Sequence, residues 1–236
     1  MNANISRQRR FWTRRASSWD HHAGHNPGLV RVVERVLTEA APTPAMRAVD
    51  LGCGSGQLAL RLAPIVSSVL AVDISDAMIK LLSEHAHAAG IDNVEGMAVP
   101  IEHLELEEAS VDLIVSNYAL HHLRDEDKAT VVRHAARWLR PGGRLVIGDM
   151  MFGRGSESAD RQIISAKLRL LAKRGPGGWW RIAKNATRYV FRFQERPISM
   201  ERWVALLELA GFEEVEGLRV VAEAAVVRGR RANGSG

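Results

Sequence analysis

Apolar residues follow two spacings along this chain, and the two spacings alternate. Short runs of Ala, Val, Leu and Ile that end at a polar residue are typical of buried strands. Stretches with apolar residues three and four positions apart are typical of amphipathic helices. The predicted strands cover about 48–51, 69–73, 94–98, 110–117, 144–150, 215–221 and 223–227. The predicted helices cover about 11–19, 27–40, 77–89, 125–139 and 199–210. This alternation predicts an α/β fold with a mostly parallel sheet.

The first predicted strand ends in a bend that is rich in glycine. Glycines at 52, 54 and 56 permit positive φ angles and the close approach of a ligand to backbone N–H groups at a helix start. The third glycine comes one residue too early for the dinucleotide fingerprint, which disfavours hydride transfer. Asp50 and Asp73 end two strands, so both carboxylates are expected to face one crevice, with Asp73 placed to hold ribose hydroxyls. The pattern predicts a nucleoside-bearing ligand.

Three segments of the chain resemble motifs of the class I S-adenosylmethionine-dependent methyltransferases. They are Asp50-Leu-Gly-Cys-Gly-Ser-Gly56, Val72-Asp73-Ile74-Ser75 and Leu139-Arg-Pro-Gly-Gly-Arg-Leu-Val146. The resemblance runs from about residue 11 to residue 228 and is closest to the ubiquinone/menaquinone and small-molecule methyltransferase branch. It implies a Rossmann-like, doubly wound seven-stranded sheet, mostly parallel with an antiparallel edge strand, plus helical N-terminal and post-strand-5 cap elements. It also implies S-adenosyl-L-methionine as cofactor and S-adenosyl-L-homocysteine as product.

The same resemblance assigns residues to the cofactor. Trp19, followed by Asp20, resembles an aromatic–acid pair that closes over the methionine end. Ile74 and Met78 would pack against the adenine, although Met78 could equally be a plain core residue. Asn117 would offer its backbone carbonyl to the methionyl amino group. The complete predicted set is Trp19, Asp50, Gly52, Cys53, Gly54, Gly56, Gln57, Asp73, Ile74, Met78, Met97, Ala98 and Asn117.

Adenine recognition departs from the family pattern. Relatives commonly have an aspartate at the position of Met97, followed by a small residue whose backbone N–H meets the ring. We therefore expect the Ala98 backbone to carry this contact, with Met97 packing beside it or pointing away. Glu102 is a candidate substitute for the missing acid.

Two adjacent histidines follow the fourth predicted strand, at the edge of the sheet where an acceptor would approach. An imidazole can take a proton from an acceptor near neutral pH. Neighbouring residues on a helix diverge by about 100°, so at most one of His121 and His122 is expected to take part in the chemistry, and we prefer His122. The other would pack. Asp149 ends the fifth strand and could bind substrate, orient a base or make a structural hydrogen bond.

Composition limits the alternatives. The 236 residues suit one α/β domain, and Cys53 is the only cysteine, so no intramolecular disulfide can form. The small side chain of Cys53 fits between glycines, which favours packing over a nucleophilic role. His21, His22 and His25 lack a supporting ligand set, so no metal site is predicted. No apolar run reaches the roughly 20 residues of a membrane span, and no apolar core follows the N-terminal arginines. A cytoplasmic location is expected.

Positive charge gathers in one segment. Residues 151–196 contain eleven basic and three acidic residues, whereas the whole chain carries a net charge of only +5. Such a segment could lie on an anionic membrane surface, bind phosphates, cap the acceptor pocket or be a solvated face. The resemblance favours a cap over an apolar or anionic acceptor.

The sequence thus predicts a domain plan and a reaction. The plan is an N-terminal helical lid at 1–46, a cofactor-binding core at 47–150, a basic cap at 151–198, a C-terminal helix with edge strands at 199–228 and a mobile tail at 229–236. The reaction is in-line methyl transfer to a small molecule that could be apolar, quinone-like, lipid-like or a secondary metabolite. An RNA methyltransferase is disfavoured because Ser116-Asn-Tyr-Ala119 lacks the two prolines of amino-methylating enzymes. A cofactor-binding regulatory protein, the attacking atom and a homodimer stay open.

Overall fold

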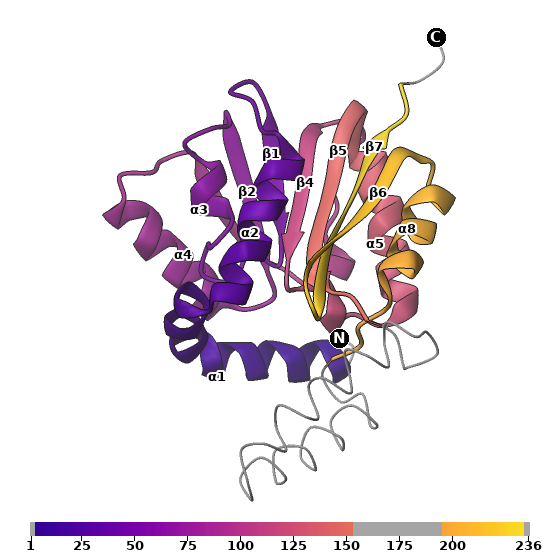
Figure 1. Ribbon diagram of the computed structural model, residues 1–236. Helices are drawn as coiled ribbons and strands as arrows, with labels where there is room; N and C mark the ends of the chain where they lie inside the picture. Colours follow the sequence, from indigo (N-terminus) through magenta and orange to yellow (C-terminus); the bar gives the residue numbers. More distant parts are fainter. Residues whose placement is uncertain (1–2, 153–194, 234–236) are drawn as a thin grey trace, which may run out of the picture.

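The computed structural model describes residues 3–152 and 195–233 (Figure 1). Seven strands form one sheet in the order β3-β2-β1-β4-β5-β7-β6. The strands are β1 (Arg47–Leu51), β2 (Ser68–Asp73), β3 (Val94–Ala98), β4 (Val111–Asn117), β5 (Leu139–Met150), β6 (Phe212–Val221) and β7 (Ala224–Arg231). Strands β1 to β5 are parallel, and β7 runs antiparallel between β5 and β6. The predicted doubly wound sheet is confirmed, with the reversed strand one place in from the edge.

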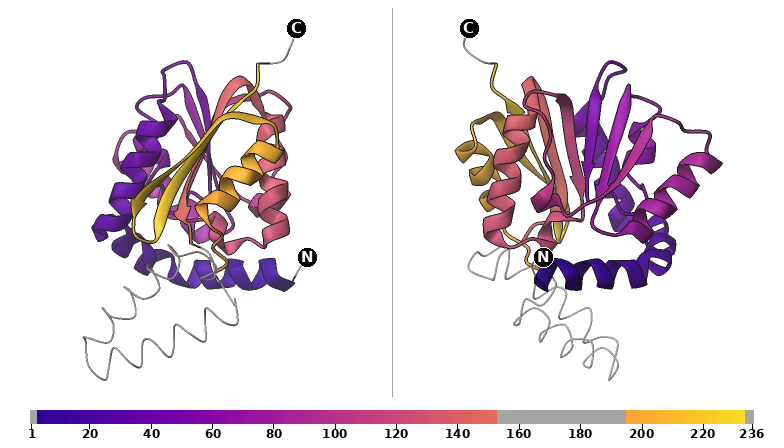
Figure 2. Two further views of the ribbon diagram at one scale, coloured as in Figure 1. Left: turned by 45° about the vertical axis from the view of Figure 1, so that its right-hand side comes forward. Right: turned by 180° about the vertical axis from the view of Figure 1, so that it is seen from behind.

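Helices cover both faces of the sheet (Figures 1 and 2). On one face lie α2 (Pro27–Ala40), the short α3 (Ala59–Leu62) and α4 (Asp76–Ala88), and on the other lie α5 (Asp125–Trp138) and α8 (Met200–Leu209). Each face has its own cluster of buried apolar residues. Two 3-10 turns, η1 (Ile101–His103) and η2 (Leu120–His122), follow β3 and β4. The chain reverses its winding between β1 and β4, the position where open α/β sheets bind ligands.

Local sequence signals set where the helices begin. The Asn26 side chain accepts hydrogen bonds from the backbone at the start of α2, and Ser75 does the same for α4. Ser199 caps α8, as the sequence predicts. Each of these caps satisfies N–H groups that the helix itself leaves unpaired.

Helix α2 belongs to the core and not to a lid. Val32, Val33 and Val36 are buried, and α2 packs on β4, β5, β7 and β6. The predicted lid at 1–46 is therefore too long, because the apolar stripe of α2 is covered by the sheet. Among the helices that the structure describes, α1 (Ala3–His25) is the one that crosses the edge at which the parallel strands end (Figures 1 and 2).

The C-terminal boundary also differs from the prediction. Strand β7 continues to Arg231, since Gly229 pairs with Leu145 and Arg230 pairs with Arg144. The tail predicted from Gly229 therefore begins later. Most of the basic segment, together with the cap and membrane-surface interpretations that depend on it, lies outside the described residues. Within the described ranges, no helix combines the length and the apolar character that crossing a membrane requires.

Candidate functional site

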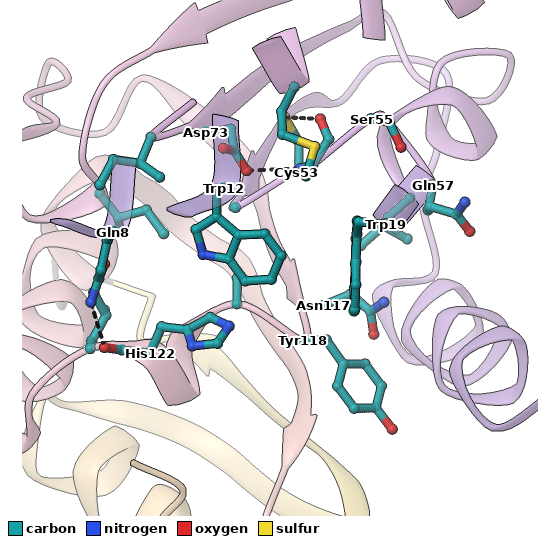
Figure 3. A pocket seen from close by; sticks show the side chains of 18 of the residues that line it. Gln8, Trp12, Trp19, Cys53, Ser55, Gln57, Asp73, Asn117, Tyr118 and His122 are labelled. Atoms are coloured by element: carbon teal, nitrogen blue, oxygen red, sulfur yellow. Dashed lines mark hydrogen bonds between the residues drawn. The ribbon is translucent and has the colours of Figure 1, made fainter. Parts of the chain in front are cut away.

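A cavity of about 90 Å³ lies where β1, β2 and β4 end, beneath α1. Such a volume is well below the roughly 300 Å³ at the lower limit of small-ligand pockets. In Figure 3, Trp12 lies between Asp73 and His122. The lining residues are Gln8, Trp12, Trp19, Leu29, Val33, Gly52, Cys53, Gly54, Ser55, Gln57, Leu58, Asp73, Ile74, Met78, Ile101, Glu102, Asn117, Tyr118, Ala119, His122 and Leu123.

The glycine bend after β1 shapes the wall of this cavity. Gly52, Gly54 and Gly56 all have positive φ angles, of 77°, 54° and 99°. A Cβ on Gly52 would lie 2.2 Å from the Cβ of Ala119, so the bend and the turn after β4 touch backbone to backbone. Gly56 lies outside the lining; its missing Cβ leaves room for Leu82, which gives it a packing role. The helix that follows is only four residues long, shorter than its apolar pattern predicts.

Replacing Gly52 by alanine should lower the free energy of unfolding by more than the same change at Gly90. Both glycines have positive φ, which costs an alanine about 1–2 kcal/mol. A Cβ at Gly90 meets nothing within 4 Å, whereas one at Gly52 meets Ala119. Overpacking should therefore add about 1–3 kcal/mol to the loss of stability at Gly52 but not at Gly90. Chemical denaturation of both variants measures the difference, and equal losses would contradict the close approach.

Asp73 ends β2 and faces the cavity. Its Oδ2 accepts a hydrogen bond from the Gly54 N–H at 3.0 Å, and its Oδ1 accepts one from the Ser75 N–H at 2.9 Å. Burial raises the pKa of Asp73 to about 6, and these backbone N–H groups limit the rise. The carboxylate therefore links the glycine bend to the start of α4 and stays ionised at neutral pH.

Asp50 lies deeper than the sequence predicts. It is 1% exposed, does not line the cavity, and neither of its oxygens has a partner within the described residues at full hydrogen-bond geometry. Burial raises the pKa of Asp50 to about 7; the Ala59 N–H opposes the rise and the Asp73 carboxylate adds to it. Asp50 is therefore a buried acid behind the glycine bend in this closed arrangement.

Changing Asp50 to asparagine should stabilise the ligand-free protein above pH 7. In the unfolded chain this carboxyl ionises near 3.8, but in the folded chain it stays protonated up to about pH 7. Ionisation therefore favours the unfolded state increasingly between about pH 4 and 7. The asparagine variant has no carboxyl to ionise, so its stability relative to the wild type should grow over that interval and then level off at about 4 kcal/mol. Unfolding curves from pH 4 to 8 test this, with the exposed Asp92→Asn as control; a pH-independent difference would contradict it.

Other predicted cofactor residues divide into two groups. Trp19, Gln57, Ile74, Met78 and Asn117 line the cavity. The Oδ1 atom of Asn117 is buried without a partner within the described residues. Trp19 does not bring its neighbouring acid into the cavity, because the Asp20 carboxylate lies 3.6 Å from Nε2 of His85 instead.

The predicted adenine contacts are not brought together here. Met97 is 37% exposed, and neither it nor Ala98 lines the cavity, whereas Glu102 does. Burial raises the pKa of Glu102. Cys53 is buried, with its thiol 3.4 Å from the Gly54 carbonyl oxygen, and burial raises its pKa well above the ordinary value. That environment favours the inert packing role that the sequence predicts.

The two adjacent histidines have different environments. His121 is 4% exposed, and its Nδ1 lies 2.5 Å from Oδ1 of the fully buried Asp149. The His121 backbone N–H donates to the other carboxylate oxygen of Asp149 at 2.8 Å. His122 faces the cavity, with its ring centroid 3.9 Å from that of His121. Asp149 and His121 thus hold the turn, and His122 is the histidine that lines the cavity.

Several cavity residues have no role in the sequence-based prediction, among them Gln8, Trp12 and Tyr118. Gln8 and Trp12 come from α1, and Tyr118 follows β4. Tyr118 has a φ of 51°, and its N–H donates to the Gly148 carbonyl at 2.8 Å. The aromatic spacing of the first helix hinted at Trp12, but no local pattern distinguishes a cavity residue from a packing one.

The N-terminal histidines form part of a helix and not of a loop. The His25 Nδ1 lies 2.7 Å from the His21 carbonyl oxygen, one turn away in α1. No group of three or more His, Cys, Asp or Glu side chains suited to a metal ion occurs within residues 3–152 and 195–233.

Comparison with known proteins connects this geometry to a family. Residues 48–143 match the family model described as "Methyltransferase domain". The chain is 36% identical over 103 residues to the uncharacterized methyltransferase YcgJ of Bacillus subtilis, covering 44% of this chain and 40% of that one. It is 33% identical over 139 residues to the 27-O-demethylrifamycin SV methyltransferase of Amycolatopsis mediterranei, covering 56% and 48%. The chain thus spans less than half the length of both relatives.

A solved structure extends the likeness to nearly the whole chain. The 1,6-didemethyltoxoflavin-N1-methyltransferase of Burkholderia thailandensis superposes with a TM-score of 0.65 and 17% identity, covering 98% of this chain and 92% of that one. That similarity shows the fold. Residues 48–143 thus match a methyltransferase domain, and together these findings support the resemblance of this chain to the class I S-adenosylmethionine-dependent methyltransferases.

Proposed function

We propose that this protein transfers a methyl group from S-adenosylmethionine to a hydroxyl oxygen of a small molecule and releases S-adenosylhomocysteine. One observation carries the proposal: a single cavity at the carboxyl ends of the parallel strands is lined by both the Asp73 carboxylate and the His122 side chain. Two groups with different chemistry therefore face the same space, one suited to a cofactor and one to an acceptor.

The residues around the cavity fit the cofactor. The Asp73 carboxylate can accept hydrogen bonds from ribose hydroxyls, and the unpartnered Asn117 Oδ1 suits an ammonium group. Gly54 lines the cavity without a Cβ, which leaves its backbone accessible. Ile74 and Met78 offer apolar surface to a base. Each of these residues can therefore serve a different part of an amino-acid nucleoside.

The role of the protein in the reaction follows from this arrangement. S-adenosylmethionine, when bound, supplies a methyl group on a positively charged sulfur that is already a good leaving group. The protein must therefore align the acceptor and exclude water, and α1 lies across the opening. His122 takes the hydroxyl proton at a ring nitrogen as the oxygen bonds to the methyl carbon. Asp149 positions the turn that presents His122.

The relatives support a small-molecule acceptor. One is named for 27-O-demethylrifamycin SV, and the Burkholderia structure holds 1,6-didemethyltoxoflavin together with S-adenosylhomocysteine. An oxygen acceptor is favoured here because an imidazole in the cavity is needed only when the acceptor loses a proton. A nitrogen that already carries a free lone pair would not need one.

Two measurements test the proposal. Isothermal titration calorimetry should detect binding of S-adenosylmethionine at one site per chain. Incubation with methyl-labelled cofactor and a metabolite extract should then yield labelled small molecules that lose the label on ether cleavage. Absence of cofactor binding would overturn the proposal. Binding without any labelled product would favour a regulatory protein, and label in RNA alone would favour an RNA methyltransferase.

A further inference from the structure

Helix α1 contributes one face to the cavity. Gln8, Trp12 and Trp19 line it at spacings of four and seven residues, which place them on the same side of a helix. Hydrogen bonds fix the position of this face. The Gln8 amide donates to the His122 carbonyl at 3.0 Å, as Figure 3 shows, and Arg9 Nε donates to the Ile74 carbonyl at 3.1 Å. Trp12 is thus held between the turn that follows β2 and the turn that follows β4.

The Trp12 ring has a defined orientation. Its centroid lies 5.1 Å from that of His122 at an interplanar angle of 65°, and 5.5 Å from that of Trp19 at 75°. Phe11 adds a third edge-to-face contact at 5.3 Å. Aromatic pairs prefer such geometries, so these contacts hold the indole against rotation. The indole and the imidazole together form an aromatic corner in the part of the cavity where the acceptor is expected.

Charge in the cavity restricts the acceptor further. Of the lining residues that the structure describes, none is a lysine or arginine, whereas Asp73 and Glu102 are acidic. This lining disfavours a carboxylate or phosphate group near the reacting atom. It suits an uncharged ring whose faces are apolar and whose edge carries a hydroxyl.

We propose that Trp12 determines acceptor specificity by packing against a planar aromatic ring whose hydroxyl lies at His122, so that the acceptor is a phenol or hydroquinone. This inference rests on the proposed methyl transfer and narrows its substrate class. In the reaction, the phenolic oxygen gives its proton to His122 and forms the new bond to the methyl carbon. The sulfur–methyl bond breaks, and its electron pair stays on the sulfur.

The test uses two alcohols with the same carbon skeleton, one aromatic and planar and the other saturated. The protein is first saturated with S-adenosylhomocysteine and then titrated with 2-naphthol or with its saturated counterpart, 2-decalol. The aromatic alcohol should bind about two- to tenfold more tightly, since one aromatic contact contributes about 0.5–1.5 kcal/mol beyond its buried area. Trp12→Leu should abolish this preference, Trp12→Phe should keep most of it, and the distant, exposed Leu209→Ala should not change it.

The outcomes separate this inference from the proposed function. Equal affinities for the two alcohols, no binding of 2-naphthol, or an unchanged preference in Trp12→Leu would overturn the role of Trp12. Failure of S-adenosylhomocysteine to bind in the first titration would instead overturn the proposed function. A normal first titration for Trp12→Leu shows that this variant is folded.

Discussion

Replacing Asp73 by alanine should weaken the binding of S-adenosylmethionine at least about 100-fold. A hydrogen bond to a charged group contributes about 1.5–3 kcal/mol, and an ionised carboxylate can accept two from a ribose. The substitution also removes the acceptor that joins the Gly54 and Ser75 N–H groups. The glycine bend would then lose its link to α4. Calorimetric titration at pH 8, where Asp73 is ionised, measures the loss.

Two further variants make the Asp73 result interpretable. Asp73→Asn keeps the shape and one acceptor oxygen, so its affinity should fall between those of the wild type and the alanine variant. The exposed Asp92→Ala changes the net charge equally and should bind the cofactor normally. Thermal unfolding of each variant shows whether it is folded. A folded Asp73→Ala protein with wild-type affinity would rule out Asp73 as the ribose-binding residue.

Sequence patterns predicted the features that depend on neighbouring residues. Strand ends, the glycine bend and the Ser75 and Ser199 caps are local, because each depends on residues only a few positions apart. The parallel order then followed from the alternation of strands and helices. These two features together predict from sequence alone that Asp73 faces the cavity.

Contacts between distant segments could not be predicted in the same way. Gln8 meets His122 across 114 residues, and the aromatic spacing of α1 does not show which ring meets which partner. Asp50 and Asp73 look equivalent in sequence, since each ends a strand. Asp50 is nevertheless buried outside the cavity, whereas Asp73 lines it.

The two adjacent histidines, His121 and His122, differ in their surroundings, and this difference separates their roles. Two adjacent residues must point apart, so the sequence could limit the chemistry to one of them. The sequence already favoured His122, and the structure adds that Asp149, 28 residues from His121, binds His121 through both its backbone and its ring. A strand-end acid opposite the pair thus assigns one histidine to the fold and leaves the other to the cavity.

Substituting glutamine for His122 should lower kcat about 100- to 1,000-fold while leaving the affinity for S-adenosylmethionine within about twofold, because general-base catalysis contributes factors of this size. Glutamine keeps the polarity and approximate size of the side chain but cannot take up a proton in this pH range. The rate of the variant should also lose the rise with pH that an imidazole base gives to the wild type near neutrality.

His87→Gln, an exposed change on α4, should retain full activity. The assay follows the labelled product found with the metabolite extract, over pH 5.5–9. A His122→Gln enzyme with wild-type kcat would rule out His122 as the general base.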